Sequence, residues 1–299
     1  MLIPANINKS IALSIGKLKQ PVITKYQLSV LIFKSYLSDY SLKNLKTKRK
    51  PYSKAFDQIL DNLLEIGVIN ENKDFSELSV FNILGKDDSE SEEIICTIDP
   101  FSYISHLSAM SYHGLTDRMP KMIFISSPAS RKWSQFAQKL MKKDLGEDFN
   151  NYRSSKLPKL QRIRLNKINK QVINCYSSMH YGAFKSIKRK NLRISTIGRT
   201  FLDMLRRPDL CGGIHHIIQI FKEFGPQYLG LIVDEIDRHG KQIDKVRAGY
   251  ILEEVCGQRD KTIDSWIKFV QRGGSRKLDP SEEYSHRYSE RWCLSINID

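Results

Sequence analysis

The sequence predicts an α+β protein in which a small unit of helices and one β-hairpin precedes a larger mixed α/β unit. Three observations lead to this fold class. Residues 53–66 carry apolar side chains at helical spacing, and Gly67 follows them. Two short extended stretches joined by a polar turn come directly after that glycine. The remainder alternates strand-like and helix-like patterns, and 299 residues suffice for about two domains. We expect these domains to cover residues 1–95 and 96–299.

The charge balance predicts a polyanionic partner. Lysine and arginine number 48 against 33 aspartates and glutamates, which gives a formal net charge of +15. Such an excess most often serves nucleic acid and less often an anionic membrane surface. No stretch approaches the roughly 20 apolar residues of a membrane-spanning helix, and the first residues show no export signal, so we expect a cytoplasmic protein without membrane contact. The five scattered cysteines, none in a CxxC pair, predict reduced thiols rather than disulfides or a zinc site.

Two helices are expected before a lysine-rich connector. Apolar residues from 6 to 19 repeat at helical spacing, and the proline at position 21 ends the first helix. Thr24 is expected to cap the second helix, whose buried stripe begins with Leu28 and Ile32. The basic end of the connector, residues 40–50, then leads into a third helix.

The third helix carries the sharpest functional signal. Ser53 occupies the N-cap position, and Phe56 and Ile59 begin an apolar stripe at helical spacing. Residues 68–70 and 78–84 are predicted to be strands that a polar turn connects. Helix, glycine and hairpin in this order are typical of a winged helix-turn-helix, in which the start of the recognition helix enters the major groove of DNA.

Basic and polar side chains around the start of this helix are the predicted DNA contacts. The lysines would mainly hold phosphates, with binding that weakens steeply with salt, whereas Ser53, Lys54 and Gln58 would contact base edges. A solvated loop followed by an ordinary exposed helix is the alternative interpretation. The predicted DNA-binding residues are Lys46, Lys48, Arg49, Lys50, Tyr52, Ser53, Lys54, Gln58, Asn72 and Lys73.

An acidic tract separates the two predicted domains. Residues 87–93 hold five acids and no apolar residue, so we expect a flexible loop beside the hairpin. Residues 1–86 carry a net charge of +6, this tract −5 and residues 94–299 +14. The larger half is therefore more positive than the half that is expected to bind DNA.

The second domain is predicted to pass from mixed structure to helices. Residues 94–98 should form a strand, and a helix should begin at Asp99 and stop at Gly114. Further strands are expected at residues 122–125, within 160–176, at 186–194 and at 292–298, and helices at 130–145, 196–205, 214–224, 226–238 and 241–255.

Cations recur among apolar residues of the second domain. Alternation would place them on one face of a sheet, where they would bind nucleic acid or another partner, or would only be solvated. Arg206 and Arg207 resemble a helix end whose side chains could touch a partner, and Arg199 with Asp203 is expected to form an ordinary ion pair. The candidate surface comprises Lys156, Lys159, Arg162, Arg164, Lys167, Lys188, Arg189, Lys190, Arg206 and Arg207.

No constellation in the sequence predicts catalysis. His215 and His216 are adjacent and therefore point to different faces of a helix, and none of the seven histidines has a partner at metal-ligand spacing. The sequence contains no HExxH, no GxSxG and no phosphate-binding glycine loop. We predict no catalytic residue, no cofactor and no metal site.

Two stretches of the second domain resemble a known family. They are FSYISHLSAMSYHGLTDRMPKMIFIS, residues 101–126, and LRISTIGRTFLDMLRRPDLCGG, residues 192–213, and a closing segment with a tryptophan and an asparagine, RWCLSINID, follows the linker GGSRKLDP. Together and in this order they resemble the AbiEi family, the antitoxins of bacterial type IV toxin-antitoxin systems. The resemblance covers nearly the whole chain.

The resemblance implies a bifunctional protein. Its N-terminal domain would repress its own operon by binding inverted repeats in the promoter, as a monomer in solution that pairs on double-stranded DNA. Its C-terminal antitoxin domain, with the basic candidate surface, would counter a cognate nucleotidyltransferase toxin, in many such systems without a stable complex. The lysine-rich connector and the acidic tract depart from the compact family pattern.

Two other classes of function stay open at this point. One is an RNA-binding protein or nucleic-acid-processing enzyme that uses the basic second domain. The other is a transcription factor whose second domain senses a ligand. Rescue of growth from a neighbouring toxin gene would separate the antitoxin from the second alternative.

Overall fold

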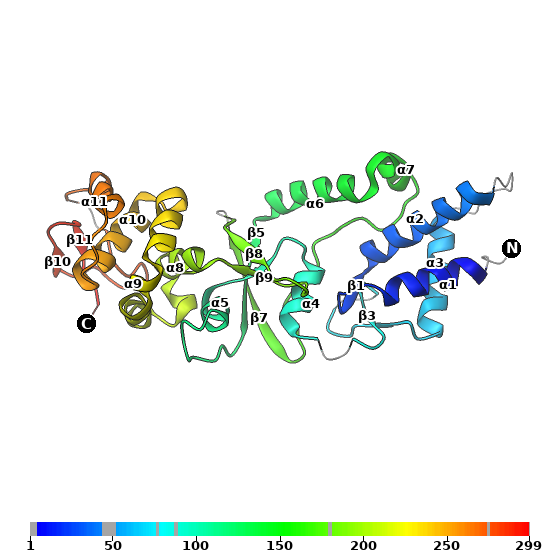
Figure 1. Ribbon diagram of the computed structural model, residues 1–299, viewed down its shortest axis with the longest axis horizontal. Helices are drawn as coiled ribbons and strands as arrows, with labels where there is room; N and C mark the ends of the chain where they lie inside the picture. Colours follow the sequence, from blue (N-terminus) through cyan, green and yellow to red (C-terminus); the bar gives the residue numbers. More distant parts are fainter. Residues whose placement is uncertain are drawn as a thin grey trace.

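The protein is an elongated α+β molecule with a mixed sheet between two helical ends (Figure 1). The computed structural model describes residues 5–43, 52–75, 78–86, 89–178, 181–273 and 276–298. The chain begins at one end of the molecule and finishes at the other. We call its three parts the N-terminal unit (residues 5–86), the central unit (89–195) and the C-terminal unit (196–298). The predicted α+β class with a multi-strand sheet is confirmed.

The N-terminal unit alternates helices and strands in the order helix, strand, helix, helix, strand, strand. Within the described residues, its three strands pair antiparallel in the order β1, β3, β2. The elements are α1 Ala5–Gly16, β1 Val22–Thr24, α2 Lys25–Lys43, α3 Tyr52–Glu65, β2 Ile69–Glu71 and β3 Val80–Ile83.

Local chemistry explains where the helices of this unit begin and end. The Thr24 hydroxyl accepts a hydrogen bond from the Gln27 amide at 3.2 Å, and the Gln27 side chain accepts one from the Thr24 amide at 2.9 Å. This reciprocal capping box fixes the start of α2 as expected. After α3 the chain turns at Gly67, whose φ of 68° is a conformation that glycine adopts without steric cost.

Residues 94–98 form the end of a helix, α4 Ser91–Ile98, so the predicted strand is wrong. Ile94, Ile95 and Ile98 are buried at helical spacing, and Glu92 and Glu93 lie in the first turn, where a helix dipole favours negative charge. The last part of the acidic tract is therefore helical rather than a flexible loop. Asp87 and Asp88 lie outside the described residues.

The helix predicted from Asp99 onward is shorter than expected. Asp99 instead holds a turn, because its carboxylate accepts hydrogen bonds from the Phe101 amide at 3.0 Å, the Ser127 hydroxyl at 2.7 Å and the Trp133 indole at 2.9 Å. A strand, β4 Tyr103–Ile104, follows, and the helix α5 occupies His106–Tyr112. A buried carboxylate with three donors thus overrides the helical pattern.

The central sheet has six strands among the described residues, in the order β6, β7, β5, β4, β9, β8. The pairs β4/β9 and β5/β7 are parallel and the other pairs antiparallel. Besides β4, the elements are β5 Ile123–Pro128, α6 Ser130–Leu145, the short 3₁₀ helix η1 Gly146–Asp148, α7 Phe149–Ser154, β6 Lys167–Ile168, β7 Gln171–Ser178, β8 Phe184–Ser186 and β9 Arg193–Ser195.

The C-terminal unit is mainly helical and ends in a small hairpin. The helix α9 joins two predicted helices across a kink at Tyr228, two residues after Pro226. The predicted final strand shrinks to two residues. The elements are α8 Ile197–Arg206, η2 Pro208–Cys211, α9 Ile214–His239, α10 Gln242–Gly249, the π-helix η3 Tyr250–Val255, α11 Lys261–Ser265, η4 Trp266–Phe269, β10 Tyr288–Ser289 and β11 Leu294–Ser295.

The N-terminal core extends into the central unit. Met141, Leu145, Tyr152 and Leu157 belong to the same buried cluster as the apolar residues of α1, α2 and α3. Figure 1 shows α6 and α7 reaching over α2. The division at residue 95 therefore does not separate two cores, and it stays a prediction. No helix within the described ranges is long and apolar enough to cross a membrane.

Candidate nucleic-acid interface

The solvent-facing side of α3 is basic only at its start. Lys54 and Gln58 are exposed and Ser53 is half-buried, but the same side continues with acids that are also exposed. These acids are Asp57, Asp61 and Glu65. Phosphates repel carboxylates, so only the first turn of α3 suits close approach of a duplex. Tyr52 begins the helix, whereas Lys46, Lys48, Arg49 and Lys50 lie outside the described residues.

The hairpin after α3 is held against the central unit. Asn72, a predicted DNA contact, is 7% exposed, donates from its amide to Asn82 at 2.7 Å and accepts from the Asp74 backbone at 3.0 Å. Its side chain is used inside the hairpin, which corrects the expectation that it faces a duplex. Asp74 in turn accepts a hydrogen bond at 2.8 Å from the backbone of Asn169, between β6 and β7. Lys73 is exposed.

The basic residues of the central unit do not form one sheet face. Lys156 has a φ of 54° and opens an irregular segment, residues 153–164, which we call the basic strap. Of the predicted cations only Lys167 lies in a strand, so the expected alternation is wrong for this stretch. The strap is irregular because it must leave α7 and cross to the sheet, while the Pro158 carbonyl accepts a hydrogen bond from the Tyr152 hydroxyl at 2.6 Å.

A groove brings two of the predicted sets together. It has a volume of about 810 Å³, and its lining includes Ser53 from α3 and Lys156 and Lys159 from the basic strap. Lys188, Arg189 and Lys190 lie elsewhere, in the turn between β8 and β9, where Lys190 pairs with Glu90 at 2.7 Å. Asn72 and Ser53 aside, the listed cations of both sets are exposed wherever the structure describes their side chains, except for partly buried Arg162, Arg206 and Arg207.

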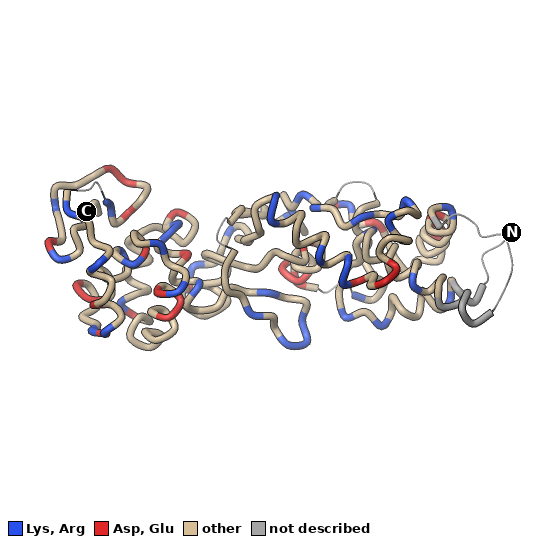
Figure 2. Tube along the Cα trace, turned by 90° about the horizontal axis from the view of Figure 1, so that it is seen from above, with Lys and Arg blue, Asp and Glu red and all other residues tan. Residues whose placement is uncertain are grey.

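Positive charge is concentrated in the central unit. Residues 94–195 hold 19 lysines and arginines against five acids, a net charge of +14, whereas residues 196–299 hold 16 of each and are neutral. In Figure 2 the basic positions dominate the middle of the molecule, and both signs intermingle over the C-terminal helices. A polyanion would therefore be attracted to the central unit and the adjoining start of α3.

Arg206 and Arg207, predicted to be available to a partner, are used internally. Arg206 pairs with Asp244 at 2.8 Å and donates to the His239 carbonyl at 2.8 Å. Arg207 pairs with Asp209 at 2.7 Å, and its guanidinium lies 5.2 Å from the centre of the Tyr176 ring. The hydrogen bond from Arg207 lowers the pKa of Asp209. These contacts correct the expectation that both arginines belong to a binding surface.

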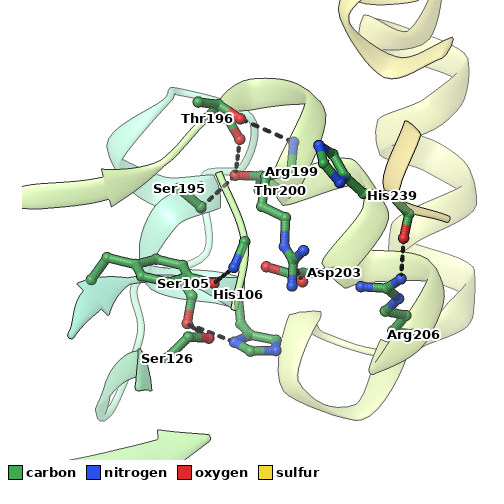
Figure 3. A network of polar contacts seen from close by, with 12 residues as sticks. Ser105, His106, Ser126, Ser195, Thr196, Arg199, Thr200, Asp203, Arg206 and His239 are labelled. Carbon is green, nitrogen blue, oxygen red and sulfur yellow. Dashed lines mark hydrogen bonds and ion pairs between the residues drawn. The ribbon is translucent and has the colours of Figure 1, made fainter. Parts of the chain in front are cut away.

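A buried polar network joins the central sheet to α8 (Figure 3). Arg199 and Asp203 form the predicted ion pair at 2.9 Å, and each side chain is only 3% exposed. Thr196 caps α8 by accepting from the Arg199 amide at 3.3 Å, and the Thr200 hydroxyl lies 2.8 Å from that of Ser195. Sequence spacing predicted the pair but not its burial.

His106 lies at the edge of this network. Its Nδ1 is 2.8 Å from the Ser105 hydroxyl, which accepts a hydrogen bond from the Ser126 hydroxyl at 2.9 Å. Burial lowers the pKa of His106, which Asp203 opposes and Arg199 and Arg207 reinforce. Its Nε2 and one carboxylate oxygen of Asp203 have no hydrogen-bond partner in the structure. The sequence gave no sign of this arrangement, because Ser105 and Ser126 are far apart in the chain.

Metal-binding groups do not gather within the described ranges. There, no three histidine, cysteine, aspartate or glutamate side chains are grouped so that they could hold an ion. The buried cysteines are held as thiols by their surroundings, since burial raises the pKa of Cys96 and Cys211. Chemistry at these positions therefore has no support beyond the polar network.

Comparisons with known proteins identify no family. No family model matches the chain, and no curated protein matches it. A solved structure, the crystal structure of RV2827C protein from Mycobacterium tuberculosis, is similar with a TM-score of 0.49 and 11% sequence identity, covering 98% of this chain and 92% of that one. At this level the similarity concerns the course of the chain and says nothing of what either protein binds.

Proposed function

We propose that this protein binds double-stranded DNA through a winged helix-turn-helix in its N-terminal unit. The observation that carries the proposal is the order helix, strand, helix, helix, strand, strand with the antiparallel sheet β1, β3, β2. In this arrangement α3 is the recognition helix and the β2/β3 hairpin is the wing. Ser53 and Lys54 approach the major groove from the first turn of α3, while its acidic remainder stays clear of the phosphates.

The proposed role of the DNA binding is autorepression by an antitoxin. The support is the resemblance of residues 101–126 and 192–213 to the AbiEi family, given above from the sequence alone. In this proposal the N-terminal unit binds inverted repeats in its own promoter as two copies, and the rest of the chain counters a nucleotidyltransferase toxin without acting as an enzyme. The net charge of +14 in residues 94–195 supports a further role for the central unit close to nucleic acid.

Gel-shift titration of the upstream DNA tests the DNA-binding proposal. Replacing Lys50 and Lys54 by alanine should weaken binding at least tenfold and reduce its salt dependence, because each phosphate contact contributes a slope of about 0.9 in log affinity against log salt. The matched control replaces Lys222 and Lys261, two exposed lysines of the neutral C-terminal unit. Unchanged affinity of the Lys50/Lys54 variant would overturn the proposal.

Growth rescue tests the antitoxin role separately. Expression of the adjacent reading frame should arrest growth if it encodes a nucleotidyltransferase toxin, and this protein should restore growth. The Lys50/Lys54 variant should still rescue when it is expressed from an independent promoter, because repression and toxin neutralisation use different parts of the chain. Failure of the unmodified protein to rescue would remove the antitoxin role and leave the DNA-binding proposal intact.

A second candidate is binding of structured RNA by the central unit. The observation that favours it is the position of the charge, since 19 of the 48 lysines and arginines lie in residues 94–195 rather than beside α3. Filter binding of a structured RNA, with duplex DNA of equal length as competitor, separates the two. RNA binding that a large excess of DNA does not displace favours this candidate, and cleavage of the RNA would favour a processing enzyme.

A further inference from the structure

The groove beside α3 has walls from two units of the molecule. On one side lie the first turns of α2 and α3, including Lys25, Ser53 and Asp57. On the other side the basic strap follows the rim with Arg153 and Lys159. The volume of about 810 Å³ is within the range of roughly 300 to 1,000 Å³ that is typical of small-molecule sites. The start of the proposed recognition helix therefore borders a recess of the size that a small ligand fills.

The recess combines an apolar lining with a cationic rim. Four cations line it, namely Lys25, Arg153, Lys156 and Lys159, and among the lining residues that the structure describes Asp57 is the one acid. Apolar side chains line it as well. They are Tyr26, Phe56, Ile98, Leu157, Pro158, Leu160 and Ile163. A net positive rim over apolar walls is complementary to a molecule with one anionic end and one apolar body.

The strap that forms one wall is fixed at both of its faces. Leu157 is 6% exposed and packs in the N-terminal core, and the Pro158 carbonyl is held by the Tyr152 hydroxyl at 2.6 Å. The ring of Tyr152 packs edge-on against Phe33 of α2 at 5.2 Å. The recess is therefore a built feature, because its wall is anchored to the same core that positions α2 and α3.

We propose that this groove binds a small amphipathic anion, and that its occupant and duplex DNA exclude each other. The second part rests on the proposed function. A carboxylate or phosphate would lie among Lys156, Lys159 and Arg153, with the apolar body between Phe56 and Ile163. Ser53 lines the groove, whereas its neighbour Lys54 is exposed and does not, so ligand and duplex would meet at adjacent residues of one helical turn. Like charges at that separation repel, and the occupant would release DNA.

A fluorescence titration with 8-anilino-1-naphthalenesulfonate (ANS) tests the site on the full-length protein. This probe carries one sulfonate on an aromatic body. Saturable binding is expected, weakened about tenfold or more by Lys156→Gln with Lys159→Gln, which removes two cations of the rim. Gln161→Glu should also weaken it, because this nearly isosteric change places a carboxylate on an exposed lining residue. Lys139→Gln with Lys143→Gln, two exposed positions of α6 outside the groove, is the matched control.

Three results would overturn the site. They are the absence of saturable binding, equal affinity in the Gln161→Glu variant, and displacement of the probe by inorganic phosphate as readily as by dodecanoate. The last would mean that the apolar walls contribute nothing. Circular dichroism of each variant checks that the fold is kept, and Gln161→Glu keeps the test valid if the double lysine variant is damaged.

Adding duplex DNA from the upstream region separates this inference from the proposed function. ANS should release the duplex from the unmodified protein at concentrations that leave it bound to Gln161→Glu. Release at the same concentration from both proteins, or simultaneous binding of probe and duplex, would overturn the mutual exclusion. Duplex binding without any probe binding would end the groove proposal alone, and probe binding without any duplex binding would end the DNA-binding proposal and leave the site.

Discussion

The central and C-terminal units are nearly equal in length but use their charges in opposite ways. In the C-terminal unit acids and bases balance, and they pair across its helices, as Arg206 does with Asp244 and Arg291 with Glu253 and Asp264. In the central unit only five acids face 19 bases, and Asp99 and Asp144 among these acids already hold hydrogen bonds from Ser127 and Tyr26. Most of its cations therefore have no acid nearby to neutralise them.

This difference separates charge that builds the fold from charge that is presented outward. Paired ions over short distances add to cohesion within a unit, whereas an unbalanced set raises the potential around it and attracts polyanions. The composition of the whole chain, +15, hides this division because it adds a neutral unit to a strongly basic one. Four substitutions, ordered by their expected effect on stability, break or sharpen the comparison.

The largest effect is expected at the buried ion pair of α8. Asp203→Asn leaves Arg199 charged in a site where both side chains are 3% exposed. Removing one partner of a buried pair costs about 3–5 kcal/mol, because the remaining charge is uncompensated. Urea unfolding measures the loss.

An exposed pair of the same spacing in the same unit is the control. Asp234→Asn breaks the pair with Arg238, whose side chains are 54% and 68% exposed, and should cost about 0.2–1 kcal/mol. Equal losses at the two sites would show that burial does not distinguish them. The C-terminal unit would then owe little to its internal pairing.

The next effect is expected where α10 meets the closing segment. A methyl group on Gly249 would lie 2.1 Å from the ring of Trp292, which is fully buried. Gly249→Ala should therefore destabilise the protein by about 1–3 kcal/mol through overpacking. Gly230→Ala, at an exposed position of α9 with no atom within 4 Å, should stabilise it by about 0.5–1 kcal/mol. A neutral result at Gly249 would mean that Trp292 can move away.

The sequence predicted most local elements because they depend on near neighbours. Thr24 caps α2, and α6 has the predicted limits, since apolar spacing and short-range chemistry decide both. Elements that long-range contacts decide were predicted wrongly. Asp99 is held by Ser127 and Trp133, which no local pattern links to it, and a turn replaces the expected helix.

The candidate site divides in the same way. Lys54 is exposed at the start of α3 as predicted, whereas Asn72 is consumed by Asn82 across the hairpin. The basic strap could be found from its lysines, but not its position beside Ser53, because that position depends on Leu157 joining the N-terminal core. Charge is visible in a sequence, and the partner of a charge is not.

A smaller, pH-dependent effect is expected at the border of the two units. Burial lowers the pKa of His106 in the folded protein, so the unfolded chain binds the proton more readily. Its contribution to stability is complete above the unfolded pKa of about 6.5 and is lost as the pH falls from there toward the folded value. The urea midpoint should therefore drop between pH 7.5 and pH 5.5.

His106→Asn removes that dependence while tolerating the backbone. The residue has a φ of 49°, a conformation that asparagine adopts more readily than most residues. The variant should show a smaller drop in midpoint over the same pH interval, whereas His215→Asn at an exposed position of α9 should leave the drop unchanged. An identical drop in the His106 variant would assign the acid sensitivity to other groups, such as His113, whose pKa burial also lowers.

The smallest effect on stability is expected in the central unit, where it tells most about function. Lys167 in β6 and Lys188 in the β8/β9 turn are exposed, and no acid neutralises them among the described ion pairs. Replacing both by glutamine should change the free energy of unfolding by less than about 0.5 kcal/mol, because surface charges away from packed features contribute little. If their charge serves a polyanion, the slope of log affinity against log salt should fall by about 0.9 for each phosphate lost. Lys222→Gln with Lys261→Gln, in the neutral unit, should leave that slope unchanged. A slope that is equally insensitive to both pairs would mean that the excess charge of the central unit is merely solvated, and that α3 and its connector bind DNA unaided.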